Sequence, residues 1–311
     1  MTKLILLAGC AVFIAVGAAA PAAGAADKLK VVATFSILGD LAREVGGDRV
    51  EVSTLVGPEG DAHVYAPSPA DAKSLRAAKL VVVNGLGFEG WLGRLVRASG
   101  TKAAVVTASA GVAPLAGEND GDHARAATDA ADHGRSDPHA WQSVANAKTY
   151  VGNIRDALAA ADPVNASAYA ANAEAYLSKL DALETEIRDI VGGLAPDRRM
   201  IITSHDAFAY FGKAYGLTFV APQGVSTESE ASARDVARII TQIRRQGISA
   251  VFIENISDAR LSERIASETG ARLGGRVYSD ALSAPDGPAA TYVSMMRHNV
   301  RAFATALTGG S

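Results

Sequence analysis

Three histidines and one aspartate lie near the ends of strand-like runs, where their side chains could converge on a metal ion. His63 follows VEVSTLV through a Gly- and Pro-bounded loop, and His139 lies in SDPHAWQS before a helical stretch. His205 follows RMIITS, and Asp280 ends RVYSD. Each residue alone is better explained as a surface, core or capping residue. Together they indicate a metal site, because imidazole nitrogens and carboxylate oxygens are ligands of zinc and related ions.

The separations between these four residues exclude a local metal motif. Successive members lie 76, 66 and 75 residues apart, whereas zinc fingers take their ligands from neighbouring turns. In open α/β sheets, ligands bind beyond the carboxyl ends of the strands. Two members precede a long helical stretch and two follow it, which predicts a site between two lobes.

Short β-branched runs alternate with amphipathic helical patterns, which predicts parallel sheets covered by helices. Residues 164–194 interrupt this alternation with a helical pattern longer than the roughly 8–20 residues of a typical globular helix. We therefore predict an α/β fold of two lobes, each a mainly parallel sheet flanked by helices, joined by one long spine helix. The predicted division is an N-terminal lobe at 27–163, a linking helix at 164–194 and a C-terminal lobe at 195–311. The expected strands are 31–35, 50–56, 80–84, 103–109, 199–204, 217–222, 250–255 and 275–280.

Residues 1–26 have the composition of a signal peptide. Lys3 precedes the apolar run LILLAGCAVFIAVGAAA, and the small residues after it suit cleavage near Ala25 or Ala26. We therefore prefer a soluble exported protein in the periplasm. The alternative is a lipoprotein anchored through Cys10, because LAGC resembles a lipobox, although cleavage there would leave an apolar segment on the mature protein.

The composition argues against thiol chemistry and against nucleic-acid binding. Cys10 is the only cysteine, so the mature chain is expected to hold no disulfide or thiolate site. Removing residues 1–26 changes the formal net charge from −3 to −4. A mildly acidic protein without a basic patch is a poor candidate for nucleic acid.

Residues 116–137 have no hydrophobic period and are rich in Ala, Asp and Gly, so we predict a mobile loop. The loop contains His123 and His133, which form a candidate transient zinc site. Ordering such a loop costs conformational entropy, and a solvated loop without any metal role explains the pattern equally well. Both interpretations stay open.

The segment from Gly85 to Gly90 matches the G-x-G-x-x-G pattern of dinucleotide sites. However, Glu89 would place a negative charge where the pyrophosphate must bind, and no acid follows at the distance expected for a ribose contact. We interpret the glycines as serving a tight turn and close packing.

Several motifs resemble those of the zinc/manganese-type (cluster A-I) solute-binding proteins of bacterial ABC importers, most like the zinc-specific members. The motifs are GDAHVYAPSP, NGLGFEGWL, SDPHAWQSV, TSHDAFAYFGKAYGL, GVSTESEASARDV and VYSDALS. The resemblance implies the metal ligands His63, His139, His205 and Asp280, a site between two lobes joined by a rigid helix, and a monomer. It also implies delivery to an inner-membrane ABC permease, and in some relatives supply of zinc by a periplasmic chaperone.

Three imidazoles and one carboxylate suit Zn²⁺ in tetrahedral coordination. The resemblance implies that manganese-binding members have Glu where this chain has His205, so we prefer zinc and keep manganese or iron as alternatives. Four protein ligands favour capture and delivery over catalysis, because a catalytic zinc keeps a position open for water. A zinc hydrolase using the same site, with Glu228 or Asp206 as base, is the alternative from another functional class.

Overall fold

The computed structural model describes residues 27–117 and 136–309. Its first half is built on a four-stranded parallel sheet in the order β2-β1-β3-β4. The central strands are buried runs of β-branched residues, as expected of a parallel sheet covered on both faces. The elements of this half are β1 (Leu29–Phe35), α1 (Ser36–Gly46), η1 (Gly47–Arg49), β2 (Val50–Val56), α2 (Pro69–Ala77), β3 (Leu80–Val83), α3 (Leu92–Ser99) and β4 (Ala104–Thr107).

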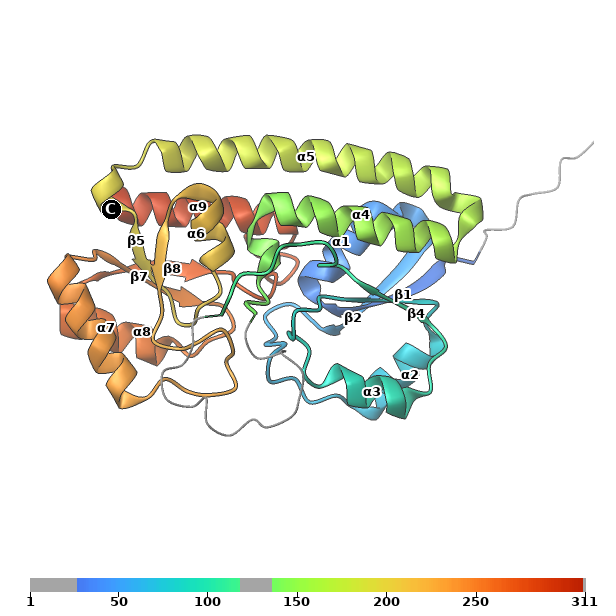
Figure 1. The fold of residues 1–311 in the computed structure, drawn as a ribbon, viewed down its shortest axis with the longest axis horizontal. Coiled ribbons are helices and arrows are strands. Elements are labelled where there is room, and N and C mark those ends of the chain that lie inside the picture. The colour runs from blue at the N-terminus through green and yellow to red at the C-terminus, as the bar shows by residue number, and fades with distance from the viewer. Residues whose placement is uncertain (1–26, 118–135, 310–311) are drawn as a thin grey trace, which may run out of the picture.

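Two long helices follow the first sheet. They are α4 (Val144–Ala161) and α5 (Ala166–Gly192), with the short 3-10 turns η2 (Ala140–Gln142), η3 (Pro163–Asn165) and η4 (Pro196–Arg198) around them. Pro163 ends α4 because proline cannot continue the helix. At about 1.5 Å per residue, the 27 residues of α5 span roughly 40 Å. Figure 1 shows α5 running along one side of the whole molecule, with α4 and α9 between it and the sheets.

The second half repeats the topology of the first. Its sheet is again parallel, in the order β6-β5-β7-β8. Its elements are β5 (Met200–Ile202), α6 (Ala209–Tyr215), β6 (Thr218–Val220), α7 (Ala233–Gln246), β7 (Ala250–Glu254), α8 (Ala259–Thr269), β8 (Arg272–Val277) and α9 (Tyr292–Thr308). The predicted fold class, with two parallel-sheet lobes and a long helix, is confirmed.

The last strand differs from its predicted position at 275–280, because β8 starts and ends three residues earlier. Asn299 of α9 explains its end. The side-chain Oδ1 of Asn299 accepts a hydrogen bond from the Tyr278 N–H (2.9 Å), and its Nδ2 donates to the Tyr278 carbonyl (2.7 Å). Tyr278 therefore leaves the sheet with both of its backbone groups hydrogen-bonded, and Asp280 lies in the loop beyond the strand.

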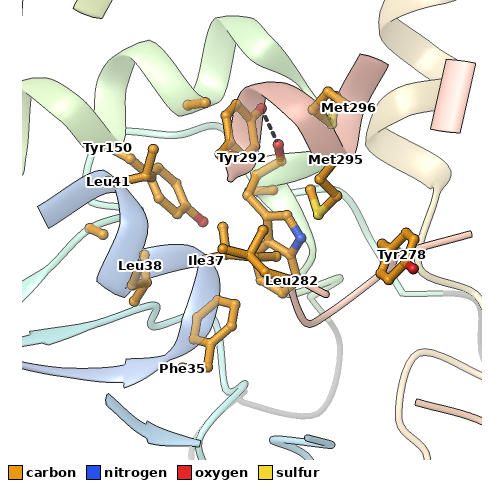
Figure 2. Close-up of a cluster of buried hydrophobic side chains, with 14 of the residues drawn as sticks. Phe35, Ile37, Leu38, Leu41, Tyr150, Tyr278, Leu282, Tyr292, Met295 and Met296 are labelled. Atoms are coloured by element: carbon orange, nitrogen blue, oxygen red, sulfur yellow. Dashed lines mark hydrogen bonds between the residues drawn. The ribbon is translucent and has the colours of Figure 1, made fainter. Parts of the chain in front are cut away.

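One hydrophobic core connects the two halves. Figure 2 shows Ile37 and Leu41 of α1 on the same side-chain cluster as Leu282, Tyr292 and Met295 from the C-terminal half. All five are buried. A continuous apolar core between the halves opposes free hinge motion, since domains that move relative to each other usually meet through small, polar interfaces. A second, smaller core lies under α7 and α8.

The predicted loop at 116–137 lies largely outside the described residues, and so do its histidines His123 and His133. Its two ends are held together by an antiparallel bridge between Ala116 and Ser136. Within the described part of the chain, no helix combines the length and hydropathy needed to cross a bilayer.

Candidate metal centre

The four residues predicted to bind a metal meet between the two sheets, and their donor atoms all lie within 4.8 Å of one another. The Nε2 atom of His139 is 3.3 Å from that of His63 and 3.4 Å from that of His205. The Asp280 carboxylate lies 3.1, 3.5 and 3.3 Å from the Nε2 atoms of His63, His139 and His205, respectively. Tetrahedral zinc with bonds of about 2.0–2.1 Å requires donor separations of roughly 3.3 Å. The two imidazole pairs that include His139, and the nearest Asp280 oxygens, therefore have the spacing expected between tetrahedral ligands.

His63 is positioned by the loop after β2. Its N–H donates to Asp61 Oδ1 (2.8 Å), which forms a local turn of the kind that Asp favours. The Trp91 indole donates to the carbonyl of the preceding residue, Ala62 (2.7 Å), and the Phe88 ring packs edge-on against the imidazole. His63 is 7% exposed, and it is the only one of the four ligand candidates that is not fully buried.

Each of the two fully buried histidines has a carboxylate beside its Nδ1 atom, the ring nitrogen that faces away from the other ligand candidates. Asp137 Oδ1 lies 2.7 Å from His139 Nδ1, and Glu254 Oε2 lies 2.5 Å from His205 Nδ1. Glu254 Oε1 also accepts from the Ser204 and His205 N–H groups, each at 2.8 Å. The Asp137 hydrogen bond fixes the His139 tautomer with the proton on Nδ1 and leaves its Nε2 lone pair for a metal, and the charge of Glu254 favours a proton at the same position of His205.

Sequence reasoning missed Asp137 and Glu254. Glu254 gave the same signal that marked Asp280, a carboxylate at the end of a strand run, here AVFIEN. Asp137 stands two residues before His139, close enough in sequence to be considered with it.

Asp280 is positioned through the residue before it, Ser279, which is hydrogen-bonded by side chains of the N-terminal half. The Trp141 indole and the Gln142 amide both donate to the Ser279 carbonyl, at 2.9 and 2.7 Å. Both carboxylate oxygens of Asp280 are buried and face imidazole nitrogens, and the described residues offer them no other hydrogen-bond donor. Buried carboxylates require a partner, and a divalent cation fits this position.

The charges around the centre shift the pKa values of its members strongly. Burial by itself lowers the pKa of His139, but Asp280 and Asp137 outweigh burial and raise the pKa to about 9. His205 is likewise disfavoured as a cation by burial, yet Glu254 and Asp280 raise its pKa well above the usual value. Burial would raise the pKa of Asp280, but His139 and His205 hold it well below its usual range. Without metal, protons on His139 and His205 therefore offset part of the buried negative charge.

The glycine-rich segment after β3 binds its own carboxylate. Glu89 accepts hydrogen bonds from the Asn84 N–H (2.6 Å), the Gly85 N–H (3.2 Å) and the Thr34 hydroxyl (2.7 Å). The N–H groups that would hold a phosphate are thus occupied. Gly85 has a φ of +84°, and a Cβ there would lie 2.5 Å from the Thr107 methyl group, which accounts for the glycine.

The comparisons with known proteins agree with the site, because they match metal-binding proteins. A family model described as zinc-uptake complex component A, periplasmic (ZnuA), matches residues 31–306. The chain belongs to this family. Its members are substrate-binding proteins of ABC importers rather than enzymes, so the hydrolase alternative is set aside. Membership also implies a membrane permease and its ATPase as partners.

Individual relatives carry different metals in their names. The chain is 35% identical over 283 residues to the manganese-binding lipoprotein MntA of Halalkalibacterium halodurans, covering 91% of this chain and 89% of that protein. It is 34% identical over 280 residues to the iron-binding protein YfeA of Yersinia pestis, covering 90% and 86%. Among solved structures, the periplasmic zinc binding protein TroA of Treponema pallidum matches with a TM-score of 0.81 and 29% identity, covering 90% and 99%.

Proposed function

We propose that this protein captures Zn²⁺ outside the cytoplasm through His63, His139, His205 and Asp280 and delivers it to an ABC permease for import. The observation that carries the proposal is the convergence of four donors: the His139 Nε2 lies 3.3–3.4 Å from the other two Nε2 atoms, and the Asp280 carboxylate lies 3.1–3.5 Å from all three. The metal is the transported substrate, so the site serves to hold and release it.

The donor types support zinc over manganese and iron. Imidazole nitrogens suit Zn²⁺, carboxylates and water suit Mn²⁺, and the Irving–Williams order places Zn²⁺ above both Mn²⁺ and Fe²⁺ at a site rich in nitrogen. The relatives named for manganese and iron binding make metal choice the property to test first.

Native mass spectrometry of the chelator-stripped mature protein, titrated with Zn²⁺ and with Mn²⁺, tests this assignment. We expect one tightly bound Zn²⁺, weak Mn²⁺ binding, and loss of the tight zinc in His205→Ala. His298→Ala is the matched control, because His298 lies on α9 with its Nε2 3.0 Å from the Arg276 carbonyl, away from the four ligand candidates. Equal retention of both metals would contradict the zinc assignment, and no bound zinc would contradict the function.

The names of the relatives bear on whether the exported protein is attached to the membrane by a lipid. The sequence favours cleavage near Ala25 or Ala26, but several relatives, including the H. halodurans protein, are named lipoproteins. Those names favour the other interpretation, in which Cys10 carries lipid, and we propose this form. Residues 1–26 lie outside the described residues. The intact mass of the protein purified from its native membrane fraction distinguishes a lipidated Cys10 from a chain that starts near Asp27.

A further inference from the structure

The loop that carries His63 reaches across to the opposite half of the molecule. The Asp61 carboxylate accepts the His63 N–H through Oδ1 at 2.8 Å and the Thr227 hydroxyl through Oδ2 at 2.6 Å. Thr227 lies 166 residues further along the chain, in the segment between β6 and α7. One side chain therefore connects the backbone of a proposed ligand to the C-terminal half.

The segment that contains Thr227 is itself attached beside a second proposed ligand. Gln223 forms a parallel bridge with His205, and the Asp206 N–H donates to the Gly224 carbonyl at 3.2 Å. The Gln223 amide also donates to the Thr227 carbonyl at 3.4 Å. Because of these contacts, Thr227 is held in place relative to His205.

Glu59 makes a second attachment of the same loop. Its N–H donates to the Leu282 carbonyl at 2.9 Å, and its carboxylate accepts from the Asn255 amide at 3.1 Å. Leu282 belongs to the core between the halves (Figure 2). Glu59 has a φ of +59°, a conformation that non-glycine residues rarely adopt and that surrounding contacts must hold. The loop is therefore bound to the C-terminal half by specific contacts on both sides of Gly60.

We propose that the hydrogen bond between Asp61 and Thr227 is a latch that joins the two ligand-bearing segments and slows the release of bound metal. This inference rests on the proposed function, in which His63 and His205 hold the same ion. Release requires the His63 loop to move away from the segment beside His205, so the latch must break before the ion leaves. During capture the latch forms only after the ion has bound. Removing the latch should therefore have little effect on the rate of metal association.

Thr227→Val tests the latch, because valine keeps the shape of threonine and removes the hydroxyl donor. Stopped-flow transfer of Zn²⁺ from the loaded protein to excess chelator measures the release rate. We expect Thr227→Val to release zinc about tenfold faster than wild type, which is the lower end of the effect expected for losing one hydrogen bond to a charged acceptor. The association rate should stay within about twofold of wild type. Thr227→Ser retains the hydroxyl and should release at nearly the wild-type rate. Thr241→Val is the matched control, since Thr241 is exposed on α7 and bonds only within its helix.

The outcomes separate this inference from the function on which it rests. If wild-type protein takes up one zinc but Thr227→Val releases it at the wild-type rate, the latch is overturned and the function stands. Equal acceleration in Thr227→Ser would also overturn it, because the hydroxyl would then be irrelevant. A matching loss of thermal stability in metal-free Thr227→Val would assign Thr227 a structural role instead. If wild-type protein binds no zinc, the proposed function and the latch fail together.

Discussion

The carboxylates of Asp137 and Glu254 set the chemical state of the imidazoles that they face. Each lies within hydrogen-bonding distance of an Nδ1 atom, so it orients the ring and makes its Nε2 a stronger donor to a metal. Together with Asp280 they bury three negative charges in one place. A divalent cation or protons can balance those charges, so the two compete for the same nitrogen atoms.

Glu254→Gln tests this role at the scale of one residue. Glutamine keeps the shape but removes the negative charge beside His205, so we expect zinc affinity to fall about 10- to 100-fold. Competition with a chromophoric chelator measures the change. Glu263→Gln, on the exposed face of α8, is the control and should bind like wild type. Unchanged affinity in Glu254→Gln would show that the charge of this carboxylate does not contribute.

The raised pKa values predict an extended pH dependence of zinc binding. The pKa of His139 is about 9 in the metal-free protein and that of His205 is also raised, so both hold protons at neutral pH and must release them. We therefore expect affinity to increase as pH rises from 6 to about 9, roughly tenfold per pH unit for each proton released. Calorimetry in buffers of different ionisation enthalpy counts those protons.

The stability of the metal-free protein should follow the opposite trend. A raised folded-state pKa of His139 contributes stability below the ordinary value of 6.5, and this contribution is lost as pH rises through about 9. Zinc affinity that stayed level between pH 7 and pH 9, with no proton release, would contradict both expectations.

At the scale of elements, the sequence predicted most of the fold because local patterns agreed with the tertiary structure. The run VEVSTLV is β2 itself, and Ser68 caps α2 through a capping box with Asp71, directly before Pro69 at the first helical position. The position of β8 could not be predicted, because Gly274 and Gly275 weaken any strand pattern, and Asn299 ends the strand from a helix 21 residues away. Convergence of the four ligand candidates was predictable from strand ends, whereas the pairing of Glu254 with His205 depends on how β5 and β7 lie side by side.

At the scale of the whole molecule, the two halves share one core, and the proposed metal site lies between them. Residues of α1 and α4 pack with α9 and Leu282 in that core (Figure 2). Unfolding of either half would expose this apolar surface and separate the ligand candidates. We therefore expect both halves to unfold together, with bound zinc stabilising the whole molecule.

Thermal unfolding with and without zinc tests this coupling. A ligand that binds only the folded state at 1,000 times its Kd adds about 4.1 kcal/mol, which for a chain of this size corresponds to a rise in Tm of roughly 8 °C. We expect a single transition that zinc shifts upward as a unit, and no shift in His205→Ala at the same zinc concentration. Two transitions, of which zinc moved only one, would show that the halves unfold independently and that the shared core does not couple them. A single transition unaffected by zinc would instead show that metal binding does not stabilise the folded state against unfolding.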